Sequence, residues 1–127
     1  MKLTTTAVTA ALLTVFAMPA LADGDAADGE KVFRKCKACH AVGDGAKNRV
    51  GPALNGVVDN PAGRNPDFTY SSGLQAAAAD GLVWDEEAME AFLTKPRDFI
   101  KGTKMSFAGL KDEEDIEDVI AYLRTFP

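Results

Sequence analysis

The five residues Cys36-Lys37-Ala38-Cys39-His40 place two thiols and an imidazole within about one turn of chain. Side chains three positions apart lie on the same face of a helical turn, so Cys36 and Cys39 can bond to one flat ligand together. His40 follows directly and can place a ring nitrogen on a metal at the centre of that ligand. This C-x-x-C-H pattern is typical of the covalent attachment of a c-type haem through two thioethers.

Two other uses of paired cysteines are zinc binding and dithiol chemistry. A closed zinc site takes four protein ligands, whereas the whole chain holds two cysteines and one histidine. A thioredoxin-like dithiol would be surrounded by alternating strands and helices, which this sequence does not show. A disulfide between residues three apart would close a very small loop and stabilise little of the fold. We therefore predict one covalently attached haem c per chain, held by Cys36 and Cys39, with His40 as an iron ligand.

A haem iron has a second axial position, for which the chain offers no further histidine. Two methionines lie beyond residue 22. Met89 stands near Phe92 in an apolar helical stretch and is expected in the core. Met105 lies in the polar, glycine-bounded segment 102–109, where a flexible thioether can reach the open face of the ring. We therefore predict Met105 as the second axial ligand.

The first 22 residues have the layout of a secretory signal peptide. Lys2 gives a positive start, residues 7–18 are mostly apolar, and Ala20-Leu21-Ala22 is a small-x-small cleavage site. The apolar stretch is short for a membrane span of about 20 residues. We expect cleavage after Ala22, export to a bacterial periplasm, no stable membrane insertion, and a single functional domain at 23–127.

The chain of 127 residues is long enough for one domain. It carries 14 basic and 19 acidic residues, a formal charge of −5, which argues against nucleic acid as a partner. The sequence predicts an all-α fold in which three main helices and one or two short ones wrap a covalently bound haem. The expected helices are 25–39, 74–79, 86–95 and 113–125. Residues 41–70 are rich in Gly, Pro, Asn and Asp and are expected to form a loop around the ligand.

Across residues 23–127 the sequence resembles class I cytochromes c, such as mitochondrial cytochrome c and the soluble periplasmic cytochromes c of proteobacteria. The matching features are Gly29, Phe33, the C-x-x-C-H motif, Gly51-Pro52, Arg64, Phe68-Thr69-Tyr70, Trp84, Leu93, Pro96, residues 102–105, Phe107 and residues 120–123. The resemblance implies the cytochrome c fold. The sequence differs from the usual family pattern at Phe92 and Lys101, where many relatives have Tyr and Pro, and at Asp59, which interrupts a loop that is often rich in Gly.

The resemblance also assigns roles to residues outside the motif. It implies that the Pro52 carbonyl accepts a hydrogen bond from the His40 ring, which orients the imidazole. It implies that Arg64, Tyr70 and Trp84 hold the haem propionates. It further implies that Gly29 and Phe33 meet Tyr122 where the first and last helices cross.

With His40 and Met105 on both sides of the iron, no position is open to oxygen or substrate. The expected function is that of a one-electron carrier, not an enzyme; the alternative is a haem enzyme or gas sensor with a labile sixth ligand. The expected partners are a membrane donor such as a bc1-type complex, and an oxidase, reaction centre or periplasmic reductase as acceptor.

Basic residues concentrate in segments 31–49 and 95–111, which hold six and five of them against one acidic residue each. These segments contain the C-x-x-C-H motif and Met105, so they are expected to flank the haem edge. We expect a monomer that docks on acidic partners through Lys35, Lys37, Lys101 and Lys104.

Overall fold

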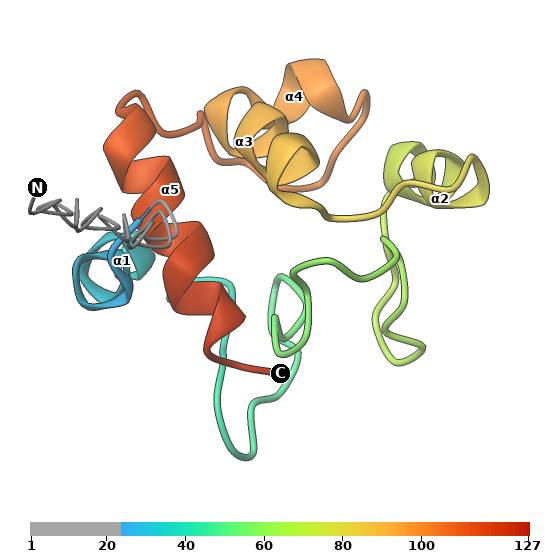
Figure 1. Cartoon of the computed structure of the whole chain (residues 1–127). Coiled ribbons are helices and arrows are strands. Elements are labelled where there is room, and N and C mark those ends of the chain that lie inside the picture. Colours follow the sequence, from blue (N-terminus) through green and yellow to red (C-terminus); the bar gives the residue numbers. More distant parts are fainter. Residues whose placement is uncertain (1–23) are drawn as a thin grey trace, which may run out of the picture.

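The computed structural model describes residues 24–127, and the predicted signal peptide at 1–22 lies outside them. Over the described residues the chain forms five helices joined by loops (Figure 1). The extended pairing in this part of the chain is a single isolated β-bridge between Pro61 and Val83. None of these helices is long and apolar enough to cross a membrane. The prediction of an all-α fold is confirmed.

The helices are α1 (Ala26–Phe33), α2 (Ser72–Ala79), α3 (Glu86–Thr94), α4 (Pro96–Phe99) and α5 (Glu113–Arg124). Side chains cap the N-termini of four of them, because short polar residues at these positions accept hydrogen bonds from the first free N–H groups. The capping residues are Asp25, Ser71, Asp85 and Asp112. Residues 41–70 contain none of the helices, as predicted.

The first helix is shorter than predicted, because α1 ends at Phe33 and not at residue 39. Beyond it the backbone continues in tighter turns: the Cys36 N–H donates to the Phe33 carbonyl at 2.8 Å, and the Cys39 N–H to the Cys36 carbonyl at 3.1 Å. Both bonds span three residues, as in a 3₁₀-helix. A spacing of three between Cys36 and Cys39 fits both conformations, so the sequence pattern could not distinguish them.

The first and last helices cross closely, as the resemblance implied. α1 packs against α5 (Figure 1), and the rings of Phe33 and Tyr122 lie 5.4 Å apart. A Cβ atom on Gly29 would overlap the carbonyl oxygen of Asp118, so only glycine allows this approach. Asp118 is buried at the same crossing and accepts a hydrogen bond of 2.6 Å from the Asp25 N–H.

The hydrophobic core lies between α1, α3 and α5. Its most deeply buried side chains are Phe33, Val119 and Ile120, together with Pro96 at the start of α4. The long loop joins this core at the C-terminus, where the Gly56 N–H donates to the Phe126 carbonyl at 2.7 Å. Helices on one side and loops on the other thus surround the interior of the molecule.

Candidate functional site

A cavity of about 680 Å³ opens between the helices and the loops. Its lining is mostly apolar, which is typical of sites that hold a large planar ligand. All eight residues that the sequence predicted for the site contribute to this lining: Cys36, Cys39, His40, Pro52, Arg64, Tyr70, Trp84 and Met105. The fold therefore brings together side chains from positions 36 to 105.

The two cysteines border the cavity as free, half-buried thiols. Burial raises the pKa of the Cys36 thiol above its ordinary value, and the nearby Lys35 charge opposes this less strongly. Cys36 and Cys39 sit on consecutive turns just after α1, so α1 and its contact with α5 fix where both sulfur atoms enter the cavity.

The imidazole of His40 is held by the segment that follows the motif. Its Nδ1 lies 2.7 Å from the Pro52 carbonyl oxygen. A carbonyl can only accept, so Nδ1 carries the proton and Nε2 is left with a free lone pair. A Cβ atom on Gly51 would overlap the ring, which shows how tightly the backbone packs against it.

Burial also sets the protonation of this imidazole. It lowers the pKa of His40 below the ordinary value, and the hydrogen bond to Pro52 raises it by a smaller amount. The neutral ring is the form that can bind a metal. Orientation, tautomer and charge of His40 thus all suit coordination through Nε2.

Met105 reaches the cavity from the loop between α4 and α5 and is half-buried. Its N–H donates to Thr103 Oγ1 at 3.2 Å. The neighbouring Lys104 Nζ donates to the Thr69 carbonyl at 3.2 Å, which ties this loop to the long one. Met89 also borders the cavity, but it is buried in α3 and belongs to the core, as predicted.

The three residues expected to hold propionates differ in their surroundings. Trp84 is buried and packs against Phe92 in a tilted arrangement, with ring centroids 4.9 Å apart. Tyr70 Oη accepts a hydrogen bond from the Asn65 N–H at 3.2 Å, which leaves its own hydrogen for donation. Arg64 Nη2 already donates to the Gly56 carbonyl at 3.0 Å, so this guanidinium also braces the loop.

The sequence analysis missed several residues that build the walls. Leu54 and Phe107 line the cavity with apolar side chains from loops that are otherwise polar, and Leu74 lines it from α2. Asn48 joins two parts of the long loop, since its Oδ1 accepts from the Ala53 N–H and from Asn65 Nδ2, both at 2.8 Å. Isolated apolar residues within a polar loop were the available signal for the walls.

These donors fit a c-type haem. Two thiols, a neutral imidazole with an available Nε2 and a thioether all border one apolar cavity. Thiols suit the two thioether bonds, and imidazole with thioether is an established pair of axial ligands for haem iron.

Comparison with known proteins agrees with this chemistry. The family model described as "Cytochrome c" matches residues 26–127. The cytochrome c2 of Afifella marina is 52% identical over 100 residues, which cover 79% of this chain and 81% of that protein. The cytochrome c2 of Agrobacterium tumefaciens is 46% identical over 101 residues, covering 80% and 91%.

A solved structure shows the same fold. The structure of cytochrome c2 from Rhodospirillum centenum superposes with a TM-score of 0.77 at 46% identity, covering 81% of this chain and 98% of that one. The match to the family model extends over the C-x-x-C-H motif, the long loop and all five helices. The chain therefore belongs to the cytochrome c family; like its cytochrome c2 relatives, it carries covalently attached haem c and acts as an electron carrier, not as an enzyme.

Proposed function

We propose that this cytochrome works in the periplasm as a one-electron carrier whose haem is held by Cys36 and Cys39 and ligated by His40 and Met105. The observation that carries the proposal is the shared cavity, which all four side chains line. When bound, the haem supplies an iron that exchanges one electron between the ferrous and ferric states. The protein positions that iron and tunes its potential.

The ligand pair explains why a carrier is favoured over catalysis. His40 and Met105 would both hold the iron, so neither oxygen nor a substrate would find a vacant site. A soft thioether such as that of Met105 favours the ferrous state and raises the reduction potential. The apolar lining acts in the same direction, because a low dielectric disfavours the more highly charged ferric centre.

The edge of the haem is the second part of the proposal. Trp84, Tyr70 and Arg64 would hold the propionates, and each lines the cavity. The Tyr70 hydroxyl hydrogen and the remaining N–H groups of Arg64 are donors suited to carboxylates. Pro52 would hold the His40 imidazole in the orientation that ligation needs.

An optical experiment tests the ligand assignment. The ferric protein is expected to show the methionine–iron charge-transfer band, and Met105→Ala is expected to abolish it and to lower the potential. Met89→Leu is the matched control, since it changes the other methionine of the domain and should keep the band. A native protein without the band, or one that binds carbon monoxide readily in the ferrous state, would support the haem-enzyme or gas-sensor alternative.

Docking is proposed to use the exposed lysines Lys35, Lys37, Lys101 and Lys104. Lys35 and Lys104 border the cavity, although Lys35 also lies 3.8 Å from Asp115, which offsets part of its charge. A basic surface around the haem edge would steer the protein onto acidic sites of a bc1-type donor and of an oxidase, reaction centre or reductase.

Ionic strength tests this surface. Electron transfer with a membrane oxidase or reaction centre is expected to slow as salt rises, because salt screens the attraction. The change Lys37→Gln should weaken this dependence more than Lys31→Gln, whose charge is paired with Asp28 on α1. A rate that stays flat or rises with salt would contradict docking through this surface.

Export is proposed from the first 22 residues. Cleavage after Ala22 would leave Asp23 as the N-terminus of a mature, periplasmic protein. N-terminal sequencing of protein purified from the periplasmic fraction tests this directly, and a retained Met1 would contradict it.

A further inference from the structure

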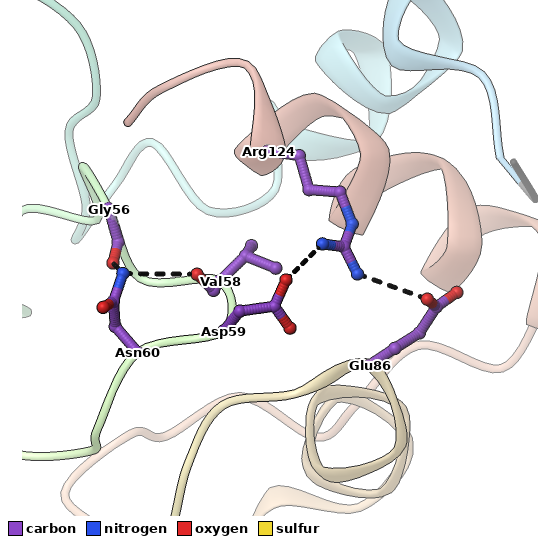
Figure 2. A network of polar contacts seen from close by, with 6 residues as sticks. All are labelled: Gly56, Val58, Asp59, Asn60, Glu86 and Arg124. Atoms are coloured by element: carbon purple, nitrogen blue, oxygen red, sulfur yellow. Dashed lines mark hydrogen bonds and ion pairs between the residues drawn. The ribbon is translucent and has the colours of Figure 1, made fainter.

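A polar cluster outside the cavity joins three distant segments of the chain (Figure 2). Arg124, in the last turn of α5, donates from Nη1 to Asp59 Oδ2 at 2.6 Å and from Nη2 to Glu86 Oε2 at 3.2 Å. Asp59 belongs to the long loop, and Glu86 begins α3. A planar guanidinium has separate N–H groups for two carboxylates, whereas a lysine ammonium is a single point charge.

The two residues that carry these carboxylates both lie next to Trp84, one through main-chain hydrogen bonds and the other along the chain. The Asp59 N–H donates to the Trp84 carbonyl at 2.8 Å, and the Trp84 N–H donates to the Asn60 carbonyl at 2.9 Å. Glu86 follows Trp84 by two residues. Arg124 therefore links the loop segment that pairs with Trp84 to the helix that begins just after it.

The loop conformation at this point is not one that the backbone prefers. Asp59 has a φ of 62°, in the left-handed region. This conformation costs free energy for a residue other than glycine and persists only where the surroundings hold the residue in it. The surroundings here are polar contacts: Arg124 holds the Asp59 side chain. Asn60 Nδ2 next to it donates to the Gly56 carbonyl at 2.6 Å (Figure 2).

We infer that Arg124 is a positioning residue for Trp84. By holding Asp59 and Glu86 together, it keeps the backbone of residues 59–60 hydrogen-bonded to that of Trp84. The indole thereby stays in the wall of the cavity. Under the proposed function, on which this part rests, the indole holds a haem propionate. Arg124 would then influence the potential of the iron without touching the haem.

Exposure of the cluster decides which measurement can detect this role. The side chains of Arg124, Asp59 and Glu86 are 40%, 59% and 44% exposed. Ion pairs this exposed contribute little to global stability. The effect of Arg124 should consequently appear in the local mobility of Trp84 and in the potential, and much less in the unfolding midpoint.

The experiment uses the haem-loaded, reduced protein. Trp84 is the only tryptophan in the chain, so its indole N–H gives a single NMR signal. Arg124→Gln is expected to speed hydrogen exchange of this N–H several-fold and to lower the reduction potential. Arg124→Lys keeps the charge but lacks the two separate nitrogens that reach Asp59 and Glu86, so the indole N–H of this variant should also exchange faster than in the native protein.

Two further variants support the comparison. Asp59→Asn removes one carboxylate, tolerates the left-handed conformation, and is expected to speed the exchange as well. Lys31→Gln is the matched control, because it removes one positive charge from an exposed ion pair that does not line the cavity. It should leave the exchange of the indole N–H unchanged.

An indole exchange rate that is unchanged in Arg124→Gln would overturn the inference. A potential that falls in Arg124→Gln, with exchange unchanged and Arg124→Lys equal to the native protein, would also overturn it, because charge alone would then explain the shift. Trp84→Phe separates the proposed function from the inference. If this variant keeps the native potential, Trp84 does not hold a propionate, while the exchange data still test the positioning by Arg124.

Discussion

Replacing Gly29 by alanine tests the crossing on which the position of the haem motif depends. The new Cβ would overlap the main-chain oxygen of Asp118 and would lie 2.8 Å from the Cβ of Tyr122. A backbone carbonyl within a helix cannot rotate away as a side chain could. The two helices α1 and α5 would have to separate, and the packing of Phe33 against Tyr122 would loosen with them.

The size of the effect follows from two opposing contributions. Alanine favours the helix over glycine by about 1 kcal/mol. Overpacking costs about 1–3 kcal/mol, and a clash with backbone belongs at the upper end of that range. The expected loss in the free energy of unfolding is therefore about 2 kcal/mol, which corresponds to a fall of roughly 10 °C in Tm for a domain of this size.

Guanidinium unfolding of the haem-loaded protein, followed by the fluorescence of Trp84, measures this loss. Glu30 is exposed on the same helix. The difference in the free energy of unfolding between Glu30→Ala and Glu30→Gly therefore measures how much α1 favours alanine over glycine at a position outside the helix crossing. If Gly29→Ala unfolds at the same or a higher guanidinium concentration than the native protein, the helices do not approach as closely as the structure shows, and the reasoning fails.

Two more predictions concern the site and its supports. Gly51→Ala should push the His40 ring off the Pro52 carbonyl and lower the ratio of haem absorbance to protein in purified material. Asp118→Ala removes a buried side chain that accepts the partly buried hydrogen bond from the Asp25 N–H, and should cost about 1–3 kcal/mol in chemical unfolding, whereas Asp118→Asn, which keeps an acceptor, should cost less.

Structural features that depend on residues close together in the chain could be predicted from the sequence. The capping by Asp112, the acidic first turn of α5 and its apolar stripe all follow from spacing within one helix, and the structure confirms them. Pro96 directly follows the predicted helix 86–95 and also begins α4, because its fixed φ suits the first position of a helix.

Contacts between distant segments could not be read in the same way. Arg124 fits the negative end of the α5 dipole, which is all that its position in the sequence predicts. Its actual partner Asp59 is 65 positions away and stood out in the sequence only as an unusual residue in its loop. The bond from Lys104 to the Thr69 carbonyl is similar, since nothing local specifies which carbonyl a lysine will meet.

The meeting of α1 and α5 also governs the order in which this chain can fold. Asp25 and Asp118 are 93 positions apart and share a hydrogen bond, so the contact forms only after nearly the whole domain has been made. Closing so long a loop costs conformational entropy before the contact returns any free energy. The packing of Phe33 against Tyr122 therefore has to await the synthesis of α5, and until then α1 lacks the partner that positions the two thiols just beyond it.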